Sequence, residues 1–263
     1  MSTQAVPIKK KRRWRDYLRA VGRAHQKASV RLETSRSLLA HLNELRQRLF
    51  KAFLAVLATT VVSFVFAEQL VEYLAQPIGG RAALVAIEIT ENVSIFMKVS
   101  LLGGFILGLP VVIYQVLSFV LPGLNKREKA WLVLGVPFAT LLFVAGVAFT
   151  WFVMFPAAIP FLTNFLGIKS QIRPANYFDF ITRLMFWIGL CFEMPLLVML
   201  LAKLKFVTAR KLLAGWRFAV LGIALVAAVV TPTVDPINMG LVMLPLMALY
   251  LISVLLAALV GRN

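Results

Sequence analysis

The chain has 263 residues, of which 60% are hydrophobic and 15% charged, and its formal net charge is +17. A soluble domain of this length carries about 25% charged residues, so the composition excludes an ordinary soluble enzyme and indicates a membrane protein. The single cysteine excludes an internal disulfide and a cysteine-based metal cage, and two histidines weaken any other metal assignment.

The first 36 residues are predicted to form a basic cytoplasmic extension, separate from a membrane domain of residues 37–263. Residues 1–51 hold 14 Lys and Arg side chains against the acids Asp16, Glu33 and Glu44. We assign this charge to anionic lipid rather than nucleic acid, because basic residues gather on the cytoplasmic side of membrane proteins. Disorder is the alternative for the extension. No cleavable signal peptide is expected, since the first apolar run starts near Leu49.

Six membrane-spanning helices are predicted, because a bilayer core of about 30 Å needs about 20 apolar residues per helix. Pro156 and Pro160 interrupt the apolar stretch after the third span, and we expect a loop there. The predicted spans are residues 49–66, 93–121, 130–155, 180–202, 212–230 and 239–260.

Six spans place both termini on one side of the membrane. In this topology the cytoplasmic segments hold 23 of the 28 Lys and Arg residues. The external segments hold Arg81, Lys169, Arg173 and Arg183. This asymmetry predicts cytoplasmic termini in the cell membrane. The fifth span is short, and a re-entrant hairpin after Arg217 is the alternative.

Glu193 lies inside the fourth predicted span, where a charge costs about 2.5–3.5 kcal/mol. A hydrogen-bonded residue between helices is one interpretation, and a substrate or partner site facing a watery cavity is the other. Pro195 removes a backbone donor two residues later and predicts a kink. A kink beside a carboxylate favours the cavity.

Two acids, Glu44 and Glu128, lie at the predicted cytoplasmic face. If their segments meet, the two carboxylates form a receptor for a cation. Simpler explanations stay open, because Glu44 and Arg48 have the spacing of a helical ion pair and Glu128 lies among basic residues.

Two further charged residues have ordinary explanations. Lys98 lies near the outer end of the second span, where its ammonium reaches the interface along its apolar stem. Asp235 lies in a turn rich in Pro and Asn, where Asp is common. The chain has no glycine-rich phosphate loop, no metal-ligand cluster and no Ser-His-Asp set, so we expect neither an enzyme nor a cofactor.

Several motifs occur in an order that resembles one family. HLNELRQRL precedes the first span, QPI follows it, and TEN…SIFMKVS enters the second. LPVVIYQVLSFVLPGLNKREK, FVMFPAAIPFL, FEMP and TP…DP continue the series. From about Leu38 onward the chain resembles TatC, the twin-arginine translocase subunit.

The resemblance implies a cup-shaped bundle of six helices with both termini cytoplasmic. It implies a receptor that binds twin-arginine signal peptides, recruits the single-span subunits TatA and TatB into a hetero-oligomer, and exports folded proteins using the proton-motive force. The positions that match the family's signal-peptide site are Glu44, Arg46, Phe119 and Glu128. Those that match partner-contact acids are Glu193 and Asp235. The motif prolines are Pro77, Pro110, Pro122 and Pro195.

Two positions depart from the family pattern. Met239 replaces a polar residue that the family often has there, with Asn238 beside it, so partner docking at this turn is not transferred. The segment with Glu91 and Asn92 lacks a proline often found there. The alternative function is a proton- or ion-coupled transporter of a small solute with Glu193 as the coupling site, although no internal repeat supports it.

Overall fold

The computed structural model describes residues 41–120, 126–163, 171–231 and 236–260, without the side chains of residues 120, 126–134 and 237–238. The chain divides into two compact units, Met1–Phe50 and Lys51–Asn263. The predicted boundary after residue 36 lies outside the described residues and stays a prediction.

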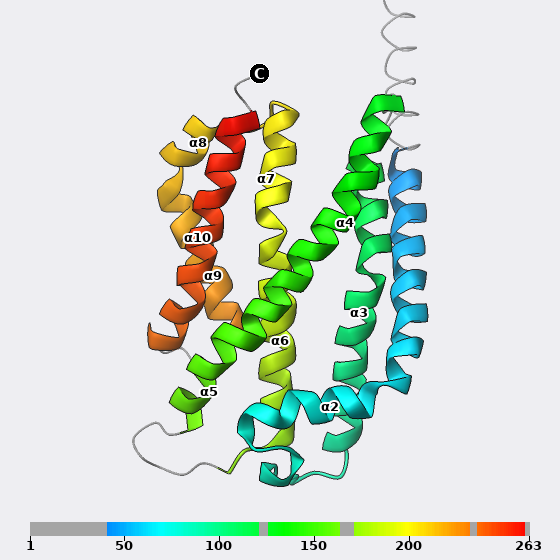
Figure 1. The fold of residues 1–263 in the computed structure, drawn as a ribbon, viewed down its shortest axis with the longest axis vertical. Coiled ribbons are helices and arrows are strands. Elements are labelled where there is room, and N and C mark those ends of the chain that lie inside the picture. Colours follow the sequence, from blue (N-terminus) through cyan, green and yellow to red (C-terminus); the bar gives the residue numbers. More distant parts are fainter. Residues whose placement is uncertain (1–40, 121–125, 164–170, 232–235, 261–263) are drawn as a thin grey trace, which may run out of the picture. The chain divides into compact units, whose positions relative to one another are not determined.

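Nearly all described residues are helical (Figure 1), which confirms the predicted all-α membrane class. Five helices are long and apolar enough to cross a membrane: His41–Val65, Glu91–Phe119, Gly135–Thr163, Pro174–Lys203 and Met239–Val260. The fifth predicted span is instead divided at Gly215 into α8 (Ala209–Ala214) and α9 (Trp216–Val230). The 15 residues of α9 extend about 22 Å, which is less than a bilayer core.

A short connecting segment follows the first described helix, His41–Val65. It contains α2 (Ala67–Ala75) and the 3₁₀ turns Gln76–Ile78 and Arg81–Ala83. Gly79 and Gly80 have φ of 94° and 87° between these turns, a conformation that glycine adopts without steric cost. Leu84 then forms an isolated parallel bridge with Ile172, so the segment is tied to the residues that precede α6.

The third apolar stretch differs from the prediction. After α3 (Glu91–Val120), α4 (Lys126–Phe149) continues through a π turn (Thr150–Met154) into α5 (Phe155–Thr163). The predicted loop after Phe155 was therefore wrong as far as Thr163. In the π turn, the Phe155 N–H donates to the Thr150 carbonyl, five residues earlier. This wider turn accommodates the missing N–H and the ring of Pro156 without ending the helix.

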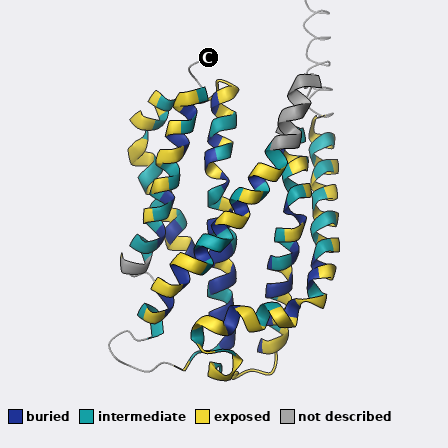
Figure 2. Ribbon diagram, viewed as in Figure 1, coloured by how far each residue is buried: buried dark blue, intermediate teal, exposed yellow. Residues whose placement is uncertain are grey.

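The fourth predicted span corresponds to α6 (Pro174–Phe192) and α7 (Met194–Lys203), and the last to α10 (Pro236–Val260). Within the unit Lys51–Asn263, α6 packs against both α3 and α4. Its buried side chains form one stripe, and Figure 2 shows the buried positions where the helices meet. The large side chains of α6 that are almost fully buried are Phe178, Ile181, Leu184 and Ile188.

Small residues allow the first helix to pack closely on α3. A Cβ added to Gly104 would lie 2.4 Å from the Thr60 Cα. The Thr59 hydroxyl donates to the Gly104 carbonyl at 2.7 Å. Close backbone approach and interhelical hydrogen bonds are the usual sources of helix association in lipid.

Candidate functional site

Glu193 lies at the break between α6 and α7. Its backbone N–H donates to the Leu190 carbonyl at 3.1 Å, and its carbonyl accepts from Leu197 at 3.0 Å. Pro195, the second residue of α7, cannot donate to the Cys191 carbonyl as a helix would require. The predicted kink at this proline is thus a break in the helix at the carboxylate itself.

The Glu193 side chain is only 8% exposed. Its Oε1 atom has no hydrogen-bond partner, a condition shared among the described residues with Ser63 Oγ and Glu91 Oε2. A buried acceptor without a donor costs about 1–3 kcal/mol. Neither of the two described cavities is lined by Glu193, so its predicted exposure to a watery cavity stays a prediction. An unpaired buried carboxyl is chemically able to take a donor from a partner helix.

The break separates two apolar clusters. The larger contains Ile188 and the other core residues of α6, together with residues of α3, α9 and the first half of α10. The smaller contains Val198 and Ala202 of α7 with Ala257 of α10. The carboxyl of Glu193 therefore lies on the connection between two separately packed parts of the unit Lys51–Asn263.

Glu44 and Arg46 lie on the first described helix, in the unit Met1–Phe50. The Glu44 Oε1 atom accepts hydrogen bonds from Arg48 Nε at 2.9 Å and Nη2 at 2.6 Å. The helical ion pair left open by the sequence is thus present. His41 Nδ1 lies 3.8 Å from the other oxygen of Glu44, and the Arg46 side chain is exposed.

The other proposed contact residues are described only in part. Phe119 is half-buried near the end of α3. Glu128 lies in the first turn of α4, and its side chain is outside the described part of the structure. Pro122 and Asp235 also lie outside the described residues. The structure therefore does not place the Glu44 and Glu128 carboxylates relative to each other.

The remaining motif prolines occupy distinct positions. Pro77 is exposed in the 3₁₀ turn after α2, where its fixed φ suits a turn. Pro110 lies inside α3 and is half-buried.

Sequence reasoning missed a group of ion pairs around the start of α6. Lys98 Nζ on α3 lies 3.0 Å from Asp179 Oδ1, and Arg183 Nη2 lies 2.9 Å from Asp179 Oδ2. The Lys98 ammonium thus pairs with the Asp179 carboxylate of another helix. The sequence predicted only that this ammonium reaches toward the interface. The spacing of Asp179 and Arg183 was a visible signal of a helical pair, whereas Lys98 is 81 residues away from Asp179.

A second group ties the segment before α3 to the residue before α6. Arg173 donates from Nε to Glu91 and from Nη2 to Glu88, both at 2.5 Å. These hydrogen bonds, first that to Glu91 and then that to Glu88, raise the pKa of Arg173 above its ordinary value. Glu91 is only 3% exposed, so its charge depends on this partner.

These helices, with five long apolar spans and a buried carboxyl between two packed parts, define a polytopic helical membrane protein. The sequence profile of the TatC family, Sec-independent protein translocase protein, matches residues 40–245. The chain belongs to the TatC family.

Individual relatives agree with this assignment. TatC of Deinococcus radiodurans is 35% identical over 235 residues, covering 85% of this chain and 86% of its own. The chloroplast proteins of Pisum sativum and Arabidopsis thaliana are 36% and 37% identical, and the chain spans 65% and 66% of their lengths. A crystal structure of the twin-arginine translocase receptor TatC superposes with a TM-score of 0.75 at 31% identity, covering 84% of this chain and 100% of that one.

Proposed function

We propose that this chain is the signal-peptide receptor and core subunit of a twin-arginine translocase. It lies in the cell membrane with both termini in the cytoplasm, binds the paired arginines of an export signal, and assembles with single-span TatA and TatB subunits. Folded cargo then crosses at the expense of the proton-motive force. The role is transport, and no catalytic step is assigned to it.

The observation that carries the proposal is the way Glu44 engages a guanidinium. Its Oε1 atom accepts two N–H bonds from Arg48, while the side chain stays 37% exposed. An exposed pair of this kind contributes about 0.3–0.5 kcal/mol, so an incoming arginine can replace Arg48 at little cost.

Arginine is favoured over lysine at such a site for geometric reasons. A guanidinium has a planar fork of donors that fits a carboxylate, whereas an ammonium is a compact point charge. We infer that Glu128 supplies a second carboxylate, so that two neighbouring arginines are bound together. Arg46 and Phe119 complete the contact surface, and Glu193 and Asp235 serve the later contact with a partner helix.

A pull-down in detergent tests the proposal. The full chain is incubated with an immobilised twin-arginine signal peptide and with a matched peptide that has two lysines. We expect retention on the first peptide and at least about tenfold less on the second, since charge-assisted hydrogen bonds contribute about 1.5–3 kcal/mol each. Equal retention would contradict the receptor assignment.

Nothing in the family match favours the small-solute transporter.

A further inference from the structure

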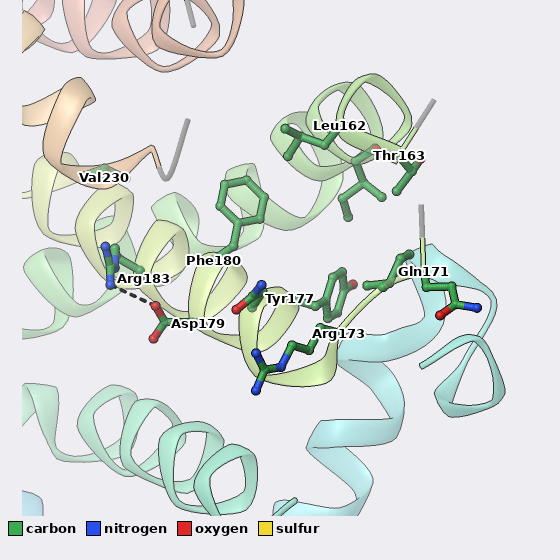
Figure 3. A pocket seen from close by; sticks show the side chains of 12 residues that line it. Leu162, Thr163, Gln171, Arg173, Tyr177, Asp179, Phe180, Arg183 and Val230 are labelled. Carbon is green, nitrogen blue, oxygen red and sulfur yellow. Dashed lines mark hydrogen bonds and ion pairs between the residues drawn. The ribbon is translucent and has the colours of Figure 1, made fainter. Parts of the chain in front are cut away.

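A cavity of about 560 Å³ lies between α5, the first half of α6 and the end of α9 (Figure 3). Its lining includes the apolar side chains of Ile159, Leu162, Phe180 and Val230. Asp179 and Arg183 of α6 line the same cavity, joined by the ion pair drawn in Figure 3. Apolar side chains beside a charged group match a ligand that is itself part apolar and part charged.

Of the two arginines that line this cavity, Arg183 has less negative charge around it than Arg173. It shares a single carboxylate, Asp179, with Lys98, so this group of three carries one excess positive charge. Arg173 also lines the cavity, but Glu88 and Glu91 hold its guanidinium. The described hydrogen bond of Arg183 uses Nη2 alone. Other N–H groups of the guanidinium can therefore donate to an anion.

We expect the charged end of the cavity near the level of lipid headgroups, because Arg183 lies only three residues after residue 180, where the fourth span is predicted to begin. Arg183 is nine residues after Pro174, the first residue of α6, which corresponds to about 14 Å along the axis. Helical side chains lean toward the N-terminus of their helix, and arginine extends its charge toward the interface. The Arg183 side chain does so here, since its guanidinium meets Asp179 one turn earlier.

A second cavity provides a contrast. It is lined by Arg81 with Glu68 and Glu72, and both acids pair with that arginine. The Arg81 side chain is 48% exposed and that of Arg183 45%, so the two side chains are exposed to a similar extent. Only the surroundings differ: one excess negative charge at Arg81 and one excess positive charge at Arg183.

We propose that the α5–α6–α9 cavity binds an anionic phospholipid, with its phosphate on Arg183 and an acyl chain along Ile159, Leu162, Phe180 and Val230. A zwitterionic lipid would bring its own cation to the same place and gain less. None of the residues that line this cavity belongs to the proposed signal-peptide contacts.

Native mass spectrometry of the full chain in detergent tests the proposal, with phosphatidylglycerol and phosphatidylcholine as probes. We expect preferential retention of phosphatidylglycerol by the unaltered chain. In Arg183→Gln the affinity for this lipid should fall about five- to tenfold, since one basic residue near an anionic lipid surface strengthens binding by about that much. Arg183→Lys should retain most of the binding. Arg81→Gln is the matched control and should bind as the unaltered chain does.

Two outcomes would overturn the proposal. One is undiminished phosphatidylglycerol binding by Arg183→Gln. The other is displacement of the lipid by millimolar inorganic phosphate, which would indicate a site for a free anion. Should the Gln variant fail to fold, a photoreactive phosphatidylglycerol on the unaltered chain decides the matter. Labelling within residues 159–183 supports the site, and labelling confined to other segments contradicts it.

Discussion

Gly146 of α4 and Gly189 of α6 meet where the two helices cross, as Figure 1 shows for the helices themselves. A Cβ added to Gly146 would lie 2.9 Å from the Gly189 Cα. A Cβ added to Gly189 would lie 2.7 Å from the ring of Phe143, which is fully buried. Glu193, at the break between α6 and α7, follows Gly189 by about one turn, so the crossing lies close to that break.

Gly189→Ala is therefore expected to destabilise the protein by about 1–3 kcal/mol, the usual cost of overpacking. For a chain of this size that corresponds to a melting temperature lower by roughly 2–10 °C. Thermal unfolding of the purified protein in detergent measures it. Gly222→Ala is the control, since nothing lies within 4 Å of an added Cβ there. Equal melting of the two variants would contradict a tight crossing.

The helical class and most helix positions followed from the sequence, since long apolar segments have few alternatives in a bilayer. The predicted second and last spans match α3 and α10 closely. The loop after Phe155 was predicted wrongly, because prolines usually end helices and no local pattern signals the π turn that accommodates Pro156. The division of the fifth span at Gly215 was also not predicted, although glycine is common where helices end.

The Arg173–Glu91 pair predicts a second stability effect. Glu91 is nearly fully buried, so Arg173→Gln leaves its carboxylate without its guanidinium partner. Such a loss is more harmful than that of an exposed pair. We expect the melting temperature of Arg173→Gln to fall clearly below that of Arg81→Gln, whose partners Glu68 and Glu72 are exposed. Thermal unfolding in detergent compares the two variants. A lower melting temperature for Arg81→Gln than for Arg173→Gln would contradict a stabilising role of the Arg173–Glu91 pair.

Glu193→Leu should separate stability from function. Replacing a buried carboxyl that has an unpaired oxygen with an apolar side chain is expected to leave the melting temperature unchanged or raise it. Export of a folded reporter should nevertheless be lost, because the partner helix then has no polar group to contact.

Ser63→Ala is the matched control for this experiment, since it removes another buried polar atom without a partner. It should export normally. Normal export by Glu193→Leu as well would indicate that Glu193 has only a structural role between helices and does not contact a partner.

Cysteine labelling tests the topology, after Cys191 is replaced by Ala. Cysteines at positions 2 and 263 should react with an impermeant maleimide only when the cytoplasmic face is open. A cysteine at Gln171, which is exposed, should react from outside. The charge asymmetry supports this orientation. Labelling of position 263 from outside would favour a re-entrant hairpin at α9.

The candidate site was predictable in part. Glu193 was visible because a carboxylate inside an apolar segment is costly, and Glu44 because of its place before the first span. The Lys98–Asp179 and Arg173–Glu91 pairs were not, since their partners are separated by 81 and 82 residues. Without the folded arrangement, no periodic pattern connects such residues.

Photocrosslinking of a twin-arginine signal peptide to the full chain tests the central claim most directly. Glu44→Ala and Glu128→Ala should each reduce crosslinking about tenfold or more, since each removes a charge-assisted acceptor, and Glu→Gln should act almost as strongly. Arg48→Ala should change it less than about twofold, and Glu68→Ala, an exposed acid that pairs with Arg81, should not change it. Membrane insertion of all variants should be normal. Full crosslinking by both Glu44→Ala and Glu128→Ala would contradict the receptor assignment.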